Sequence, residues 1–351
     1  MRYKLKAYVL NAIGQLDFME VAEPVLKEGQ VLVEVKAAGI CGSDIPRIYE
    51  NGTYHFPTIP GHEFSGVVRK VSSKAQESWL NKRVGIFPLI PCRKCPSCKD
   101  KNYEMCSSYD YLGSRSDGGY AEYVAVPEWN LIELPDSISY EAAAMLEPAA
   151  VGIHALKRID VSKAETAVVF GPGTIGLLMA QWLRLLEIKK VILVGTREEQ
   201  RELAGHLGFE NFINRKKVDA VEAVLEMTGG QGADISIECT GYGSVLCDCL
   251  NVAKRGGDIL AVGNPHSDVH LDRDTYWKLL RKQLRITGTW NSSFIPEYDK
   301  DDWRDTIKAV FFGKLQPEMQ ITHRLQFDEL HKGLEMMRDR SEYYNKVMLT
   351  R

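Results

Sequence analysis

The sequence predicts an α/β protein with two domains: a mostly β catalytic domain, and a domain built on a doubly wound parallel sheet. Three observations support this. The chain has 351 residues, enough for two hydrophobic cores. Its first third contains many short β-rich runs separated by glycine and proline, and its middle third alternates strand and helix patterns after a glycine-rich turn. We expect residues 1–152 and 290–351 to form the catalytic domain and residues 153–289 the second domain.

Composition and charge narrow the possible partners. Hydrophobic residues make up 44% and charged residues 26%, as in ordinary globular proteins. The formal net charge of −3 argues against nucleic acid or an anionic membrane surface as a partner. The start, MRYKLKAYVL, lacks the apolar core of a signal peptide, and the apolar region 167–186 is interrupted by glycines and carries Gln181 and Arg184. We therefore expect a cytoplasmic protein without a membrane span.

The first domain begins with strand-like runs that lead into a candidate metal segment. Residues 31–36 alternate valine with other side chains, and residues 67–71 and 83–87 are further β-rich runs. Between them, residues 41–66 hold a thiolate, an imidazole and a carboxylate with glycines nearby; these are Cys41, His62 and Glu63. Zinc favours this mixture, and a catalytic zinc site leaves a fourth position open. Cys41 argues against hard cations. The alternative is a buried cysteine beside a core histidine.

Two polar residues follow Cys41 directly. Ser43 is a candidate proton relay, or else a turn or cap residue. Asp44 is a candidate for orienting His62, or else caps a helix that begins near Ile45.

A second cluster, Cys92-x2-Cys95-x2-Cys98-x7-Cys106, predicts a closed structural zinc site, because four thiolates leave no open position. With no export signal, metal binding is favoured over disulfides. The alternatives are an iron–sulfur cluster and a zinc-ribbon nucleic-acid module. The region has too few lysines and aromatic residues to favour the latter.

Glu147 stands in an alanine-rich helical pattern, residues 140–155. A carboxylate in apolar surroundings is costly unless it is paired or binds a metal, so Glu147 is a further zinc-ligand candidate. The alternative is a surface glutamate before a kink.

The second domain opens with an apolar strand, residues 166–170, followed by G-x-G-x-x-G and a helical pattern. This context makes the motif a dinucleotide fingerprint, because the glycines let the backbone approach a pyrophosphate at the helix N-terminus. The predicted cofactor residues in this turn are Gly171, Gly173, Thr174, Ile175 and Gly176.

The next strand ends Gly195-Thr196-Arg197, without the acidic residue that usually binds the ribose of NAD. Space, a hydroxyl and a cation suit a 2′-phosphate, and Arg215 is a further cation that could stack on adenine. We therefore predict NADP over NAD. In the alternative, Arg197 is solvated and Glu198 or Glu199 binds the ribose. After residue 289 the chain turns polar, then helical over 301–312, and is expected to return to the first domain.

The order of these motifs resembles the zinc-dependent medium-chain alcohol and polyol dehydrogenases over essentially the whole chain. GHEFSG and Glu147-Pro148 resemble the sorbitol dehydrogenase branch, and CGSDIPRIYENG, LGSRSDGGYAEY and ITGTWN resemble galactitol-1-phosphate 5-dehydrogenases. The resemblance implies a GroES-like first domain, a Rossmann second domain, and a homodimer or homotetramer built through the Rossmann sheet edge. It also implies two zinc ions per chain, one catalytic (Cys41, His62 and Glu147 or Glu63) and one structural (the four clustered cysteines).

The implied reaction is oxidation of a polyol phosphate to a ketose phosphate, tagatose 6-phosphate. Zinc would stabilise the alkoxide, and hydride would pass to the nicotinamide. Arg47 and Arg115 are candidates for the substrate phosphate, because arginine matches phosphate geometry, or else are surface or salt-bridge residues. The alternatives are a dehydrogenase of another polyol or polyol phosphate (sorbitol, arabitol phosphate), of a secondary alcohol or of L-threonine, and a non-catalytic zinc- and nucleotide-binding regulatory protein.

Overall fold

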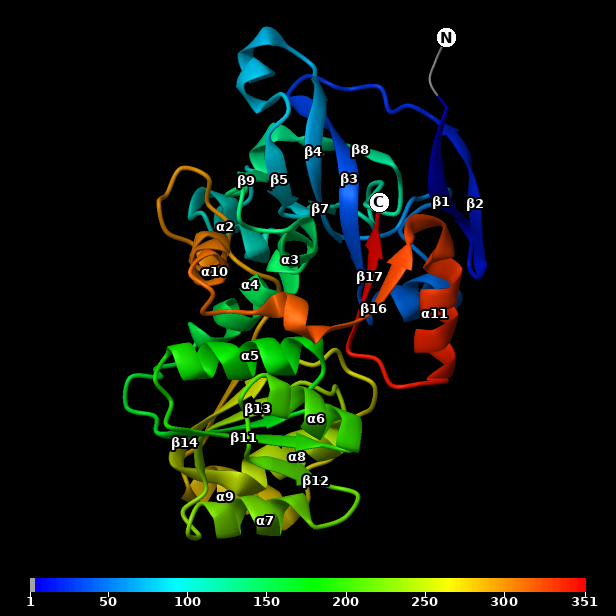
Figure 1. Cartoon of the computed structure of the whole chain (residues 1–351). Helices are drawn as coiled ribbons and strands as arrows, with labels where there is room; N and C mark the ends of the chain where they lie inside the picture. Colours follow the sequence, from blue (N-terminus) through cyan, green and yellow to red (C-terminus); the bar gives the residue numbers. More distant parts are fainter. Residues whose placement is uncertain (1–3) are drawn as a thin grey trace. The chain divides into compact units, whose positions relative to one another are not determined.

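The computed structural model describes residues 4–351, and the chain divides into two compact units (Figure 1). Unit 1 comprises the residues up to Glu147 together with Ser293–Arg351, and unit 2 comprises Pro148–Ser292. These boundaries differ by a few residues from the predicted 152/153 and 289/290, because one helix, α4 (Leu146–Leu156), runs across the first of them. Residues 1–3 of the predicted first domain lie outside the described residues.

Unit 1 is built on a seven-stranded sheet in the order β16-β17-β3-β4-β5-β9, with β8 also paired to β3. Two further pairs, β1-β2 and β6-β7, lie outside this sheet. The strands are β1 (Lys4–Ala12), β2 (Gln15–Ala22), β3 (Gln30–Ile40), β4 (Glu63–Val71), β5 (Arg83–Ile86), β6 (Leu89–Ile90), β7 (Asp110–Tyr111), β8 (Tyr123–Pro127), β9 (Leu131–Glu133), β16 (Ile321–Gln326) and β17 (Lys346–Thr350). The helices are α1 (Asp44–Pro46), α2 (Pro96–Lys99), α3 (Tyr140–Ala144), α10 (Asp302–Phe311) and α11 (Leu330–Asp339), with short turns η1 (Arg47–Asn51), η2 (Lys74–Trp79), η3 (Tyr103–Met105), η4 (Glu128–Asn130), η5 (Pro317–Gln320) and η6 (Phe327–Glu329).

The central strand β3 carries the predicted valine alternation, and Val31, Val33 and Val35 are all buried. Its neighbours come from distant parts of the sequence: β4 lies along one edge, whereas β8 and the C-terminal β17 share the other. Figure 1 shows β17, in red, beside the blue β3. The C-terminal strand is therefore part of the main sheet.

Unit 2 holds a six-stranded parallel sheet in the order β12-β11-β10-β13-β14-β15. This is the doubly wound dinucleotide-binding order, and it confirms the predicted Rossmann fold. The strands are β10 (Thr166–Phe170), β11 (Lys190–Gly195), β12 (Phe212–Asn214), β13 (Ala233–Glu238), β14 (Ala253–Ala261) and β15 (Arg285–Gly288), and the helices are α5 (Thr174–Leu185), α6 (Glu198–His206), α7 (Ala220–Met227), α8 (Gly243–Val252) and α9 (Arg273–Arg281).

One sequence expectation fails locally: residues 140–155 do not form one helix. The structure has α3 and α4, separated at Met145, which is fully buried. The break lies two residues before Glu147, so this carboxylate occupies the first turn of α4.

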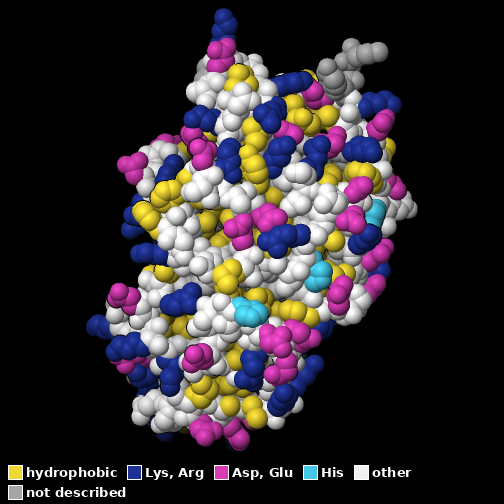
Figure 2. Space-filling view, in the orientation of Figure 1, with side chains coloured by type: hydrophobic (Ala, Val, Ile, Leu, Met, Phe, Trp, Pro, Cys, Tyr) yellow, Lys and Arg dark blue, Asp and Glu magenta, His cyan; other side chains and the backbone are white. Residues whose placement is uncertain are grey.

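Two general expectations can be compared with the structure. Among residues 4–351, we find no helix that is long and apolar enough to cross a membrane. Figure 2 shows lysine and arginine side chains interspersed with aspartate and glutamate over the visible face, which presents no continuous basic stripe.

Candidate metal centres and dinucleotide site

The sheet of unit 1 brings the first predicted metal segment together. Cys41, His62 and Glu63 each offer one ligand atom, and these atoms all lie within 4.8 Å of one another. Cys41 is half-buried, and the other two are buried. The reason is the strand register: Gly39 near the end of β3 pairs with Glu63 at the start of β4, so residues far apart in the sequence meet at one end of the sheet.

A glycine fixes the approach to His62. Gly61 has a φ of +94°, and a Cβ at this position would lie 2.6 Å from the ring of Tyr120. Only glycine tolerates both the backbone conformation and the close ring. The glycine beside His62 therefore allows close packing at this site.

Asp44 is fully buried and connects the parts of this site. Its carboxylate accepts hydrogen bonds from the Cys41 amide (3.1 Å) and the Tyr120 hydroxyl (2.7 Å), and it lies 3.4 Å from His62 Nδ1. Burial opposes its ionisation, yet the neighbouring His62 and Arg47 hold the pKa of Asp44 below its usual value. Although His62 Nδ1 makes no hydrogen bond among the described residues, the nearby carboxylate can orient the imidazole toward a metal.

Ser43 lies in a turn at the N-cap position of α1, although its side chain makes no cap hydrogen bond, and Asp44 is the first residue of α1 rather than its cap. The Ser43 hydroxyl instead points to the Cys41 sulfur at 3.3 Å.

Glu147 is buried near this cluster but is not part of the tight group of Cys41, His62 and Glu63. The Tyr111 hydroxyl donates a hydrogen bond to Glu147 Oε1 at 3.3 Å. Burial raises the pKa of Glu147 to about 7, although the nearby His62 opposes the shift. Geometry therefore places Glu63 closer to the ligand group, and Glu147 remains a neighbouring candidate.

The charges around the cluster fit a divalent cation. Four acidic groups meet here, the carboxylates of Asp44, Glu63 and Glu147 and the thiol of Cys41, and without a metal their cationic neighbours are His62, Arg47 and Lys346. A thiolate and several buried carboxylates are costly without compensating positive charge. A zinc ion would balance them, and sulfur, nitrogen and oxygen donors are ligands that it prefers.

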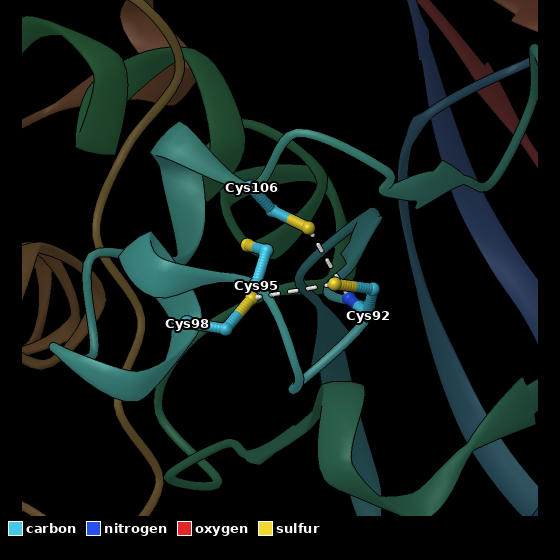
Figure 3. A group of neighbouring side chains, drawn as sticks. All are labelled: Cys92, Cys95, Cys98 and Cys106. Atoms are coloured by element: carbon cyan, nitrogen blue, oxygen red, sulfur yellow. Dashed lines mark hydrogen bonds between the residues drawn. The ribbon is translucent and has the colours of Figure 1, made fainter.

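The four clustered cysteines also converge, as Figure 3 shows. The sulfurs of Cys92, Cys95, Cys98 and Cys106 lie within 4.8 Å of one another, and all four thiols are free. The sulfurs of Cys92 and Cys98 are 4.0 Å apart, which is far too long for a disulfide. This arrangement matches a closed tetrathiolate site.

Backbone hydrogen bonds prepare two of these sulfurs for a metal. Amide groups of Cys98 and Ser107 lower the pKa of Cys95 to about 6, and amide groups of Lys94 and Cys95 lower that of Cys92. Thiolates are the metal-binding form of cysteine. The lobe also packs on Tyr103, Trp129 and Ile295, so it ties the returning C-terminal segment to the N-terminal half of unit 1.

In unit 2, the three fingerprint glycines occupy the positions that the motif predicts. Gly171 has a φ of +89°, as a tight turn requires, and a Cβ on Gly176 would lie 2.2 Å from the Gly171 carbonyl oxygen. Gly173, which precedes α5, has nothing within 4 Å of its Cβ position and leaves room for a ligand. Thr174 and Ile175 form the first turn of α5, whose N-terminus favours phosphate.

The end of β11 carries no carboxylate, and two charged residues near it, Glu198 and Arg215, are already paired. Glu198 contacts Lys217 (2.8 Å), Arg201 (3.2 Å) and Asn214 (2.6 Å). Arg215 forms an ion pair with Asp248 at 3.0 Å, so the side chain predicted to stack on adenine is held by α8. Gln200 accepts hydrogen bonds from the amides of Thr196 and Arg197.

Arg197 differs from these residues, since no ion pair joins it to an acid in the described part of the chain. Gly195 beside it is closely packed, because a Cβ there would lie 2.6 Å from the ring of Phe212. Thr196 and Arg197 are both partly exposed.

The two candidate phosphate arginines have different surroundings. Arg47 Nη1 donates a hydrogen bond to Asp44, and its guanidinium group also interacts electrostatically with Cys41 and Tyr111. Arg47 therefore adjoins the first metal cluster. Arg115 lies between two aromatic rings, 4.1 Å from the centroid of Tyr54 and 4.2 Å from that of Tyr109. It also donates to the Tyr109 carbonyl and the Tyr54 hydroxyl, which favours the structural alternative for Arg115.

Sequence reasoning missed three residues of the site: Tyr111, Tyr120 and Lys346. Tyr120 holds Asp44, Tyr111 reaches Glu147, and Lys346 forms a buried ion pair with Glu63. Lys346 lies 283 residues from Glu63 in the sequence, at the start of an apolar strand, and no local signal marks it. Burial alone would lower the pKa of Lys346, but the negative charges of Glu63 and Cys41 outweigh burial, so the pKa is higher than usual.

Two family models match the chain. The alcohol dehydrogenase GroES-like domain matches residues 27–136, and the zinc-binding dehydrogenase model matches residues 174–311. Among curated relatives, galactitol 1-phosphate 5-dehydrogenase of Escherichia coli K12 is 32% identical over 94% of this chain and 95% of its own length. Erythritol/L-threitol dehydrogenase of Mycolicibacterium smegmatis is 31% identical over 95% and 94%, respectively.

Solved structures of other dehydrogenases are also similar to this chain. Galactitol-1-phosphate dehydrogenase from Escherichia coli superimposes with a TM-score of 0.91 at 31% identity, covering 99% of this chain and 100% of the other. A zinc-binding dehydrogenase from Sinorhizobium meliloti 1021, bound to NADP, also has a TM-score of 0.91, at 27% identity and full coverage of both chains (100%). A protein described as a short chain alcohol dehydrogenase from Escherichia coli CFT073, complexed with NADH, has a TM-score of 0.89 at 26% identity and 99% coverage of both.

These similarities span both units and both sets of motifs. They make the chain an oxidoreductase rather than a non-catalytic regulatory protein, with a GroES-like domain and a Rossmann domain. The chain belongs to the zinc-dependent medium-chain alcohol and polyol dehydrogenases that use NAD or NADP.

Proposed function

We propose that this enzyme oxidises a secondary hydroxyl of a polyol phosphate to a ketone, with galactitol 1-phosphate as substrate and tagatose 6-phosphate as product. The observation that carries the proposal is the buried group of Cys41, His62 and Glu63 with Arg47 beside it. Apart from Nη1, the guanidinium N–H groups of Arg47 have no hydrogen-bond partner among the described residues. They are suited to a phosphate. The similarity to galactitol-1-phosphate dehydrogenase of Escherichia coli, in sequence and in structure, supports this choice of substrate.

In this proposal Cys41, His62 and either Glu63 or Glu147 would hold a zinc ion, whose Lewis acidity stabilises an alkoxide at neutral pH. Asp44 keeps the imidazole of His62 oriented. The Ser43 hydroxyl, 3.3 Å from the Cys41 sulfur, takes the proton from the substrate hydroxyl and passes it toward solvent. The glycine-rich turn of unit 2 would hold an oxidised dinucleotide, which would accept the hydride. The four clustered cysteines would hold a second, structural zinc.

Replacing Arg47 with alanine tests the substrate class. We expect the KM for galactitol 1-phosphate to rise by about 10- to 100-fold, because a charge-assisted hydrogen bond contributes roughly 1.5–3 kcal/mol. The KM for unphosphorylated galactitol should change far less. The ratio of the two KM values is the measured quantity, since loss of the Asp44 contact affects both substrates equally.

Arg115→Ala is the matched control, and its KM ratio should equal that of the wild type. A parallel rise in both KM values for Arg47→Ala would assign Arg47 to the support of Asp44 alone. Faster turnover of an unphosphorylated polyol such as erythritol by the wild type, followed by absorbance at 340 nm, would contradict the polyol-phosphate proposal.

We further propose that the cofactor is NADP rather than NAD, with Arg197 binding the 2′-phosphate. Two observations support this proposal. Glu198 is already bound to Lys217 and Asn214, and β11 ends without an acidic residue. Arg197→Ala should raise the KM for NADP by about 10- to 100-fold and leave that for NAD nearly unchanged.

Arg201→Ala serves as the comparison for Arg197, since Arg201 lies in the helix that follows Arg197 but contacts Glu198 and the ring of Phe212. It should preserve the NADP preference. Equal KM values for the two cofactors in the wild type would refute the assignment.

We also propose that two copies associate through the edge of the Rossmann sheet. Strand β15 ends the sheet, and Tyr276, Trp277 and Leu280 on the adjacent α9 are each about half exposed or more. An unpaired edge beside exposed aromatic side chains favours strand pairing with a second copy. Light scattering should give a dimeric or tetrameric mass, and a monomeric mass at micromolar concentration would contradict the proposal.

A further inference from the structure

The most unusual feature of the metal-binding end of unit 1 is a buried lysine. Lys346 and Glu63 are both only 2% exposed, and the lysine ammonium group donates a hydrogen bond to Glu63 Oε2. It donates a second one to the Ile40 carbonyl at 3.2 Å. A fully buried lysine is rare unless it is paired, so this contact is specific.

The surrounding backbone closes the space around this pair. A Cβ on Gly39 would lie 2.5 Å from Glu63 Oε2 and 3.5 Å from Lys346 Nζ. The register of the sheet fixes both partners, because β3 pairs with β4 at Glu63 on one edge and with β17 at Val347 on the other. The C-terminal strand thus delivers one cation to the carboxylate that lies within 4.8 Å of the Cys41 and His62 donor atoms.

We propose that Lys346 is a positioning residue that competes with the catalytic metal for the Glu63 carboxylate. One oxygen of Glu63 is bound to the ammonium group, so at most the other is available as a ligand. A carboxylate that shares its charge with a lysine is a weaker metal ligand. The metal therefore keeps more of its positive charge, and Glu147 or the substrate can replace Glu63 more easily. This inference rests on the proposed zinc-dependent function.

The test is the variant Lys346→Met in the full-length protein loaded with zinc or with cobalt. With the cation removed, both oxygens of Glu63 turn to the metal. We expect release of this zinc to a chelator to slow by about tenfold or more, and kcat to fall while the KM for substrate changes little. If Lys346 had only a structural role, its replacement would instead weaken metal binding and speed the release of zinc.

Cobalt absorption provides a readout that does not depend on turnover. The spectrum of cobalt-loaded Cys41→Ser, which retains only the four-cysteine site, is subtracted from each variant. The visible bands of Lys346→Met should shift and weaken as the oxygen coordination of cobalt increases. The double variant Lys346→Met/Glu63→Gln should lack the shift seen in Lys346→Met, because the neutral amide is a poor ligand.

Two further variants keep the proposal falsifiable if Lys346→Met does not fold. Lys346→Arg retains the cation and should keep the wild-type bands. Gly39→Ala retains both charged groups but places a methyl against Glu63 Oε2, and it should change the bands and the release rate in the same direction as Lys346→Met.

The outcomes separate this inference from the function on which it rests. A wild type that binds neither zinc nor cobalt at Cys41 and His62 would refute the proposed function. A wild type that binds the metal, together with unchanged bands or faster zinc release in folded Lys346→Met and Gly39→Ala, would overturn only the role of Lys346.

Discussion

Cys41→Ser is expected to lose one zinc per chain and to lower kcat/KM by about 10³-fold or more. The thiolate is the softest donor of its group, and serine is a poor zinc ligand. A bound metal contributes several kcal/mol to stabilisation of a developing alkoxide, and each 1.36 kcal/mol corresponds to a factor of ten in rate. Because Cys41 is only half-buried and accepts a side-chain hydrogen bond from the small Ser43 hydroxyl, the fold should tolerate the change.

Cys247→Ser is the matched control for this loss. Its thiol is also half-buried, in α8 of unit 2, and donates to the His270 carbonyl, which a serine hydroxyl can also do. The control should keep the zinc content and rate of the wild type. Initial rates at 340 nm and metal analysis together decide the question. Full activity in Cys41→Ser, or in a metal-free wild type, would contradict zinc-dependent catalysis.

Cys98→Ser should act on stability rather than on chemistry. Cys98 is 5% exposed, and burial without a metal raises the pKa of its thiol to about 12. Loss of one of four ligands should release the ion and leave the other sulfurs without their shared partner. Losing a structural metal is among the few changes that cost more than about 4 kcal/mol, which corresponds to a decrease in Tm of about 5 °C for a chain of this size.

The measurement for Cys98→Ser is thermal unfolding followed by tryptophan fluorescence, because Trp129 packs against the cysteine lobe. Protein that remains folded at low temperature should keep a kcat near that of the wild type. A variant that retains both zinc ions and the wild-type Tm would show that this lobe needs no metal.

Local sequence patterns were sufficient to predict the two folds and most of the candidate ligands. The four cysteines are close neighbours in the sequence, so short turns bring their sulfurs together almost independently of the remaining chain. The glycine fingerprint is equally local, since the strand, the turn and the helix that shape it are contiguous. The GroES-like and Rossmann architectures follow from repeated strand and helix patterns in each half.

Other features depend on side-chain contacts that no local pattern predicts. The pairing of Arg215 with Asp248 and the aromatic stacking around Arg115 change what those arginines can bind. Both were plausible anion-binding residues from their type alone. Their partners lie on other elements, and only the packed structure brings them together.

The sequence by itself determined which donor atoms this protein possesses, because sulfur, imidazole and carboxylate groups at these spacings favour zinc wherever they converge. Only the tertiary structure decided their order of proximity, with Glu63 in the tight group, Glu147 beside it and Lys346 paired with Glu63. The physical reason is the register of the sheet: β3 is held between β4 and the C-terminal β17, and such long-range pairing is set by burial of the whole core rather than by any short segment.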